Sequence, residues 1–451
     1  MSSKSENKSG TADETENETK TKIPNSWHVV DALFKRDNLL VNHQIGSYND
    51  FIDNIFPNIL SQYFPMTINI NDKSYADLSE LHKAEHKIKD ITLNIIKINY
   101  KKPIIHENNG SIKLMTPNEA RLRGFTYSSP VYIDISVKVN IYDGDKIVTI
   151  PDTIIKDVLF GKIPIMVKSK YCVLDDPKNT YIEMQECKYD HGGYFIINGN
   201  EKVLITQIKI ANNEVFVYNN NRNSKYKLIA EVRSAKDGVF TTPKTLTIKI
   251  TKKDNIYNNH FRVSIPHLKQ EIPIFVLFKA LGIENDRDIL SYITNNMHDN
   301  IHKSICKILE LSIIEGKIVN TQMEAREYMV SNFNNYNKSI TLENKLKYLN
   351  YVLDNDVLPH ISSYESKAYF IGYMINKLIL CYLGVTELDD RDSYNNKRLE
   401  TPGYLLGLIT RQCVNKMVKD MKNSINKEVM YNVNDSNKNV ANIINNVSIY
   451  K

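Results

Sequence analysis

Apolar residues recur with two different periods along the chain, and the period changes from one segment to the next. In SWHVVDALFKRDNLL and NDFIDNIFPNILSQYF, between residues 26 and 64, apolar residues lie three or four apart, which predicts helices with a break near Pro57. Between about 90 and 150, DITLNIIKINY and VYIDISVKVNIYDGDKIVTIP alternate apolar with polar residues, which predicts strands. Strand-like runs return between 225 and 275. The chain is therefore predicted to be of the α+β class.

Downstream of these runs the pattern is mainly helical. The two strongest predicted helices span 367–384 and 403–422, and periodicity is lost after the second one. The first contains the most apolar helical stretch, AYFIGYMINKLILCYLG, which Asn376 and Lys377 interrupt. A buried helix is therefore favoured over a membrane span.

The composition sets broad bounds on the protein. Residues 1–24 hold almost no apolar side chains and cannot offset their ordering entropy, so they are predicted to be a disordered tail. A chain of 451 residues is long enough for two or three domains, and its net charge of +6 is compatible with a polyanionic partner. The five cysteines are scattered without a CxxC pair, which argues against a zinc site or a disulfide framework. A soluble intracellular protein without membrane attachment is expected.

Residues 191–207, HGGYFIINGNEKVLITQ, raise the question of a phosphate-binding glycine loop. Such a loop opens a helix and usually closes with Gly-Lys-Ser/Thr, so that backbone N–H groups point at the anion. Here strand-like runs lie on both sides of Asn198 and Gly199. An Asn-Gly pair in that position predicts a β-hairpin with a type I′ or closely related turn.

The remaining candidate chemistry is weak, because no GxSxG, HExxH or GxGxxG motif occurs. His191 has no identifiable catalytic partner, so a structural or exposed histidine is favoured. Asp143 and Asp145 flank a glycine, and a tight turn is favoured over a pair of metal ligands. The acidic run DDRD at 389–392 resembles a divalent-metal site. The favoured alternative is that its carboxylates cap neighbouring elements and that Arg391 neutralises them.

The predicted helix 403–422 has an apolar side and a basic side. Its apolar side consists of Leu405, Leu406, Ile409, Val414, Met417, Val418 and Met421, and its basic side of Arg411, Lys416, Lys419 and Lys422. A basic face is usually only solvated, but it can also lie along a phosphate backbone and release counterions. Lys397 and Arg398, just upstream, enlarge this basic patch.

Several stretches of the chain, in order, look like the signatures of one family. They include PNEARLRGFTYSSPVYIDI (117–135), GKIPIMVKSKYC (161–172), HGGYFIINGNEKVLITQ (191–207), KAYFIGYMINKLIL (367–380) and DDRDSYNNKRLETPGYLLGLI (389–409). From about residue 26 to residue 422 the chain resembles the second-largest subunit of multisubunit DNA-directed RNA polymerases of the eukaryotic, archaeal and large-DNA-virus type.

This resemblance implies two mixed domains that wall one side of a DNA cleft. A discontinuous protrusion is expected at 25–207 and 387–451, with a lobe at 208–386 inserted between its parts. Lysine and arginine side chains would hold backbone phosphates without reading sequence. The residues expected to face nucleic acid are Arg391, Lys397, Arg398 and Arg411.

Other residues of the family motifs are expected to shape the fold. Arg121 and Arg123 are expected to anchor it through hydrogen bonds. Four residues are interpreted as setting the backbone shape around the hairpin: Gly192, Gly193, Asn198 and Gly199. Glu201 and Lys202 are expected to pair beside its turn.

Full-length members of the family are more than twice as long as this chain. The resemblance therefore implies that catalytic residues lie beyond residue 451 or on other chains, and no catalytic residue, metal ligand or cofactor is expected here. The Mg²⁺ of the assembled enzyme is expected on the largest subunit, whose Asn-Ala-Asp-Phe-Asp-Gly-Asp type of motif this chain does not contain.

The chain is thus expected to be the N-terminal segment of a split or interrupted subunit, inactive alone. Its expected partners are the largest subunit, the rest of the second-largest subunit and DNA, with the RNA–DNA hybrid nearby. It would act in the nucleus if cellular, and in the virion or host cytoplasm if viral. The alternative is a non-catalytic scaffold or regulatory protein descended from such a subunit.

Overall fold

A computed structural model describes residues 26–35, 39–69, 88–143, 146–176, 181–219, 225–252, 260–294, 299–333 and 341–431. The predicted N-terminal tail, residues 144 and 145 of the predicted tight turn, and residues 432–451 lie outside these ranges. Helices and strands are both abundant in the described part, so the α+β class is confirmed.

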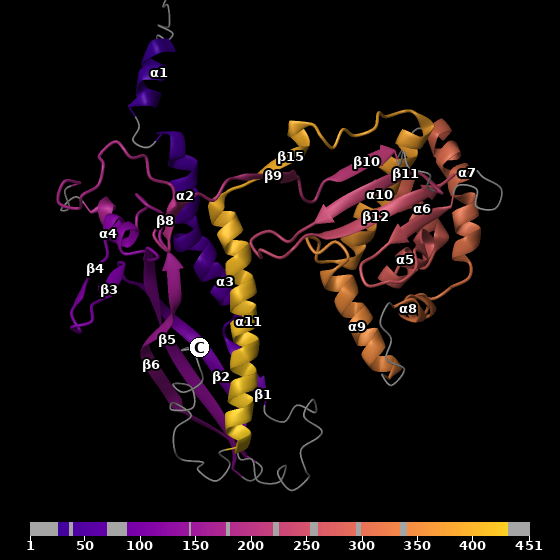
Figure 1. Ribbon diagram of the computed structural model, residues 1–451. Coiled ribbons are helices and arrows are strands. Elements are labelled where there is room, and N and C mark those ends of the chain that lie inside the picture. The colour runs from indigo at the N-terminus through magenta and orange to yellow at the C-terminus, as the bar shows by residue number, and fades with distance from the viewer. Residues whose placement is uncertain are drawn as a thin grey trace, which may run out of the picture.

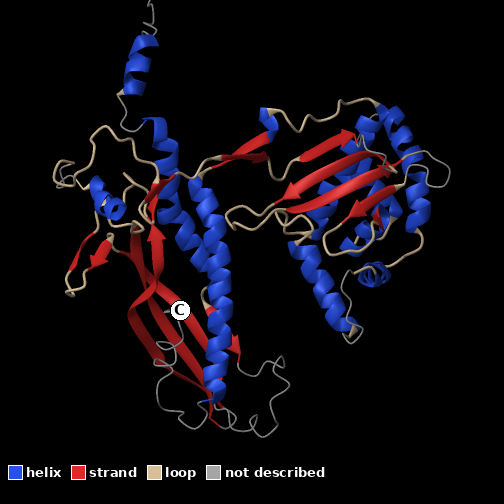
Figure 2. Ribbon diagram, in the orientation of Figure 1, coloured by secondary structure: helices blue, strands red, loops and turns tan. Residues whose placement is uncertain are grey.

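The described elements form two bodies, each with its own sheet and helices (Figures 1 and 2). The main sheet of the first body is antiparallel with strand order β1-β2-β5-β6. The elements of the first body are η1 (Leu39–Val41), α2 (Asn42–Asp50), the π-helical turn η2 (Phe51–Ile55), α3 (Phe56–Tyr63), β1 (Met66–Asn69), β2 (Ile88–Tyr100), β3 (Ile104–His106), β4 (Ile112–Leu114), α4 (Pro117–Leu122), β5 (Ser128–Asp143), β6 (Lys146–Pro164), η5 (Val173–Asp175), β7 (Phe195–Ile197), β8 (Asn200–Lys202) and α11 (Pro402–Tyr431).

The second body has an antiparallel sheet of order β10-β11-β12-β13-β14. Its elements are β10 (Val215–Asn219), β11 (Tyr226–Ser234), β12 (Lys244–Thr251), β13 (Phe261–Ser264), β14 (Ile272–Pro273), α5 (Ile274–Leu281), α6 (Asp286–Thr294), α7 (Asp299–Gly316), α8 (Gln322–Ser331), α9 (Leu342–Asn355) and α10 (Tyr364–Leu383). Strands β9 (Gln207–Ile210) and β15 (Lys397–Glu400) form a separate two-stranded ribbon between the bodies, preceded by η6 (Tyr394–Asn396) (Figure 1).

Two separate hydrophobic clusters hold the bodies together internally. One draws its buried residues from the range 215–381. The other draws them from 45–196 and again from 414–425, so that α11 returns to the body in which the chain began. Chain segments more than two hundred residues apart therefore share one core.

The helical pattern between 26 and 64 is confirmed, and the predicted break takes a specific form. Helix α2 passes through η2 into α3 without leaving helical geometry. Pro57 is the second residue of α3, and the π-helical turn η2 directly precedes it, where the missing N–H of a proline disturbs regular helical hydrogen bonding. Helix α1 (Ser26–Phe34) has no buried residue and stands apart from both bodies in Figure 1.

Helix α10 is the buried helix that the sequence predicts at 367–384. Its side chains Ala368, Ile371, Met374, Ile375, Leu378 and Ile379 are all fully buried. The two polar residues that interrupt its apolar run both have partners: Asn376 donates to the carbonyl of Ile293, and Lys377 donates to the carbonyl of Val215. Among the described residues, no helix has the combined length and apolarity that a bilayer crossing requires.

Helix α11 differs from its prediction in two ways. It continues past residue 422 to Tyr431, and Ile425 in this extension is completely buried. Ile409, expected on the apolar side, is 57% exposed. The buried stripe keeps Val414, Val418 and Met421, as predicted, and adds Gly403, Gly407 and Ile425. Two glycines begin this stripe, and because they carry no apolar side chain a hydrophobicity pattern does not register them.

These glycines let α11 approach the N-terminal helices closely. A Cβ atom on Gly403 would lie 2.0 Å from the carbonyl oxygen of Ser47 in α2, and one on Gly407 would lie 2.9 Å from Ile55 in η2. The N–H of Gly403 also donates to the hydroxyl of Ser47 at 2.9 Å. Glycine is therefore required at the crossing by close backbone approach.

The hairpin at 195–202 has the two-residue turn that the sequence predicts. Ile197 is paired with Asn200, and the two residues between them, Asn198 and Gly199, have φ of 51° and 77°. Positive φ at both positions is what a type I′ turn requires. Its second strand is shorter than the pattern suggests, because β8 ends at Lys202. The two preceding glycines, Gly192 and Gly193, also have positive φ of 71° and 81°.

Arg121 fastens this hairpin to α4. Its guanidinium donates to Glu186 at 2.7 Å, to Glu201 at 2.6 Å and to the Tyr194 hydroxyl at 2.7 Å. The sequence predicted that Glu201 would pair with the neighbouring Lys202. Glu201 instead accepts a hydrogen bond from Arg121. The position of the partner decides this outcome, since Arg121 approaches the hairpin from another element. Its expected role as a fold anchor is confirmed.

Arg123 is an anchor of a more exposed kind. Its guanidinium donates to Glu107 and Glu119 at 2.7 and 2.9 Å, while its side chain stays 37% exposed. The two arginines of the EARLR motif therefore face different environments.

Replacing Gly199 by valine should lower the free energy of unfolding by about 3 kcal/mol. A β-branched side chain resists φ of 77°, and its Cβ would lie 2.8 Å from the Cα of Gly124. Gly110→Val is the matched control, because Gly110 has φ of 81° with nothing within 4 Å of an added Cβ. Backbone strain alone should cost that variant about 1 kcal/mol. Equal urea midpoints for the two variants would show that contact with Gly124 contributes nothing.

Candidate nucleic-acid interface

The β9–β15 ribbon carries two of the four basic residues predicted to face nucleic acid, Lys397 and Arg398. Arg398 donates to the carboxylate of Glu400 at 2.5 Å and to the Tyr404 hydroxyl at 3.0 Å. Lys209, on the neighbouring strand, forms an ion pair with the same carboxylate at 2.7 Å. Burial acts to raise the pKa of Glu400, but the hydrogen bonds from Lys209 and Arg398 outweigh it and hold this pKa below its usual value. On one face of the ribbon two cations therefore share a single carboxylate, and one net positive charge remains.

Arg391 is more exposed to solvent than Arg398, whereas the Lys397 side chain is only 22% exposed. Lys397 is 3.7 Å from the fully exposed carboxylate of Asp392, a weak and screened pairing. Arg391 stacks over the ring of Tyr218, 3.7 Å from its centroid, and lies 3.7 Å from Glu231. Its side chain remains 39% exposed, so the guanidinium edge can still accept a phosphate partner.

Arg411 is built into the junction between the two bodies. It donates to Gln62 of α3 at 2.5 Å and to the carbonyl of Val239, which belongs to the loop between β11 and β12. Gln62 in turn donates to the carbonyl of Gly238 at 3.0 Å. Phe240 of the same loop lies 5.3 Å from the ring of Tyr404, at the start of α11. Arg411 thus holds the second body against α3 and α11.

The uncommitted positive charge of α11 lies on lysines further along the helix. Lys416 and Lys419 are exposed, and neither has an ion-pair partner among the described residues. Figure 1 shows α11 along the side of the first body that faces the second. The sequence pattern correctly places these lysines on the basic side of the helix. It does not show which of the basic residues have partners inside the protein.

The DDRD run forms contacts within the protein. Asp389 forms an ion pair with Lys377 at 2.7 Å and accepts a hydrogen bond from the N–H of Val217 at 2.7 Å. Within the described ranges, His, Cys, Asp and Glu side chains nowhere gather in a group of three that could hold a metal ion. Arg391 departs from the expected role of neutralising this run, because it turns toward Tyr218 and Glu231 on other strands.

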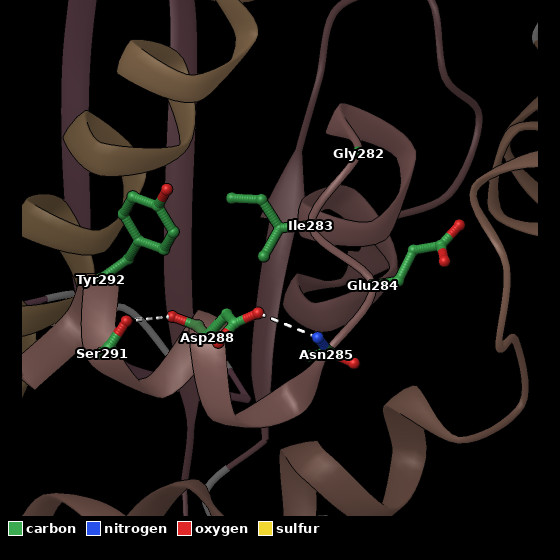
Figure 3. Close-up of a pocket in the computed structure, with 7 residues that line it drawn as sticks. All are labelled: Gly282, Ile283, Glu284, Asn285, Asp288, Ser291 and Tyr292. Atoms are coloured by element: carbon green, nitrogen blue, oxygen red, sulfur yellow. Dashed lines mark hydrogen bonds between the residues drawn. The ribbon is translucent and has the colours of Figure 1, made fainter.

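A hollow of about 460 Å³ opens in the second body between α5 and α6 (Figure 3). Its lining includes the carboxylates of Glu284 and Asp288. Glu284 accepts a hydrogen bond from the N–H of Gln322, and Asp288 accepts one from Asn285. Two carboxylates with no lysine or arginine in the lining repel phosphate, so this hollow is separate from the candidate interface. His191, the other candidate for chemistry, is exposed.

Comparison with known proteins identifies the family. A sequence model described as RNA polymerase beta subunit matches residues 39–449. The chain belongs to the RNA polymerase beta-subunit family. The family predicted from the motifs is thus confirmed, and its match continues beyond residue 422, where the recognised motifs end.

Relatives within the RNA polymerase beta-subunit family come from three kinds of organism. DNA-directed RNA polymerase II subunit 2 of Arabidopsis thaliana is 34% identical over 89% of this chain and 34% of its own length. DNA-directed RNA polymerase subunit 2 of Acanthamoeba polyphaga mimivirus is 32% identical over 87% of this chain and 33% of its own length. Subunit Rpo2N of Methanococcus vannielii is 30% identical over 90% of this chain and 74% of its own length. The chain therefore spans about a third of the eukaryotic and viral relatives and about three quarters of the archaeal one.

Proposed function

We propose that this chain is the N-terminal segment of the second-largest subunit of a DNA-dependent RNA polymerase and walls one side of the DNA cleft during transcription. The family match over residues 39–449 carries the proposal. The archaeal Rpo2N relative supports it, because this chain covers most of a polymerase subunit that is itself short. Sequence-independent contacts suit the task, since transcription moves every base pair past the same wall.

In this proposal residues 25–207 and 387–451 form the protrusion, and residues 208–386 form the inserted lobe. The hydrophobic clusters support this division, because one is built from 45–196 with 414–425 and the other from 215–381. Catalytic groups and the Mg²⁺ site belong to the largest subunit and to the remaining part of the second-largest subunit. Copurification of the largest subunit with this chain from its native source tests the assembly. A scaffold or regulatory protein would be recovered apart from active polymerase.

A double substitution, Lys397→Glu with Arg398→Glu, should weaken DNA retention by the assembled polymerase. Each lost phosphate contact should reduce the slope of log K against log salt by about 0.9. Lys303→Glu with Lys307→Glu is the matched control, since it makes the same change of charge at exposed positions of α7 in the second body. The control should keep the wild-type slope.

The measurement is DNA retention across a salt series by the purified assembly. An unchanged slope in the Lys397→Glu, Arg398→Glu variant would remove both residues from the contacts. Because Arg398 also holds Glu400, hydrogen exchange of the ribbon should accompany the titration. Faster exchange would reveal a variant whose ribbon is loosened. In that case the slope of log K against log salt would be measured on Lys397→Glu alone.

A further inference from the structure

Four aliphatic side chains are more than half exposed in and beside the β9–β15 ribbon. Val203 and Ile205, in the segment between β8 and β9, are 56% and 71% exposed, and Ile208 of β9 and Leu399 of β15 are 53% and 67% exposed. Ile208 and Leu399 are directly opposite each other in the antiparallel register, which places their Cβ atoms within contact distance. Aliphatic side chains concentrated in this way on a surface mark an interaction site.

The backbone beside these side chains has no pairing partner within the described ranges. Strand β8 pairs with β7, and β9 pairs with β15, but residues 203–206 between them make no backbone hydrogen bond to any described part of the chain. Leu204 packs against the core of the first body, while its neighbours Val203 and Ile205 point away from it. This alternation is that of a strand with one face occupied.

Two further features make this segment unusual for an exposed edge. Exposed edges are normally protected by charged residues or proline, whereas residues 203–206 read Val-Leu-Ile-Thr. The hydroxyl of Thr206 is shielded from solvent and has no hydrogen-bond partner within the described ranges. An apolar edge whose backbone groups have no partner among the described residues is a template for another strand.

We propose that residues 203–208, with Leu399, form the docking edge for a β-strand from the polypeptide that makes up the other two thirds of the curated second-largest subunits. The proposal rests on the function proposed above. The eukaryotic and viral relatives are about three times as long as the matched region, so a large amount of polypeptide must be held against this third. Permanent interfaces of that kind are apolar, as this edge is. Main-chain hydrogen bonds to 203–206 would supply affinity, and Val203, Ile205, Ile208 and Leu399 would supply specificity.

The test compares the chain alone with the assembled polymerase. Amides of residues 203–206 should exchange rapidly with deuterium in the isolated chain and at least tenfold more slowly in the assembly. Val203→Lys with Ile205→Lys should reduce recovery of the remaining second-subunit polypeptide at least tenfold in copurification. Both side chains are exposed, so the isolated variant should keep its wild-type circular dichroism. Ile314→Lys with Ile318→Lys is the matched control, at exposed positions in and just after α7, and should leave recovery unchanged.

Each outcome decides between the proposals. If the wild-type chain recovers no polymerase subunit, the proposed function fails and the docking edge fails with it. If the wild type assembles and the Val203→Lys, Ile205→Lys variant assembles equally well, or if 203–206 stay unprotected, only the docking edge is overturned. Slow exchange in the isolated chain that disappears on dilution to monomer would assign the edge to a second copy. Slow exchange that disappears on removal of residues 1–35 would assign it to α1.

Discussion

Replacing Gly403 by alanine should lower the free energy of unfolding by about 3 kcal/mol, since the crossing of α11 with α2 cannot accept a methyl group without moving one helix. The added Cβ would lie 2.0 Å from the backbone oxygen of Ser47 and 2.6 Å from its hydroxyl. A backbone atom cannot rotate away as a side chain can. The loss should appear in urea unfolding followed by circular dichroism.

Gly46→Ala in α2 is the matched control for this substitution. Gly46 precedes the contact residue Ser47, has nothing within 4 Å of an added Cβ, and lies inside a helix. Alanine there should stabilise the protein by about 1 kcal/mol through helix propensity. Opposite signs for the two glycine-to-alanine changes are therefore expected. A neutral Gly403→Ala variant would contradict the close crossing of α2 and α11.

Replacing Arg121 by methionine should cost about 3 kcal/mol of stability, because it leaves a buried carboxylate without its counter-charge. Glu186 is only 6% exposed and depends on Arg121 at 2.7 Å. Tyr194 and Glu201 lose a donor at the same time, so the hairpin at 195–202 should loosen from α4. Hydrogen exchange measured on the first body, together with its urea midpoint, provides the measurement.

Arg123→Met, two residues from Arg121, is the control that distinguishes loss of a solvent-exposed ion pair from loss of a buried one. Its ion pairs with Glu107 and Glu119 are more exposed to solvent, so that variant should lose much less stability than Arg121→Met. Adding Glu186→Gln to Arg121→Met should recover part of the loss, because a neutral amide costs less to bury than a carboxylate. Equal losses for Arg121→Met and Arg123→Met would refute the distinction.

Local pattern was sufficient where a segment is uniform. Helix α10 was predictable because its apolar residues are dense and long, and its limits of Tyr364 and Leu383 lie close to the expected 367–384. The hairpin turn was predictable because Asn198-Gly199 is the pair that adopts positive φ most readily. The C-terminal end of α11 was not, because the predicted helix ended at residue 422 and Ile425, beyond it, becomes a core residue only when packed against the first body.

At the candidate interface, too, the sequence predicted some features and only the tertiary structure showed others. Sequence pattern located a basic patch at Lys397, Arg398 and along α11. It did not show that Arg398 is held by Glu400 and Tyr404, or that Arg411 reaches Gln62 and the carbonyl of Val239. The separation between Gln62 and Arg411 is 349 residues, so no local pattern relates them. Whether these cations meet DNA stays a prediction for the salt titration.

By itself the sequence determined the local conformations and the family: where helices and strands form, where the turn at Asn198 falls, and which motifs the chain shares with RNA polymerase beta subunits. Only the tertiary structure decided that Gly403, Gly407 and Ile425 join the buried face of α11, which arginines are committed to ion pairs, and that residues 203–206 lack a backbone partner among the described residues. The physical reason is that backbone preference acts over a few neighbouring residues, whereas burial and pairing depend on segments that meet only after folding.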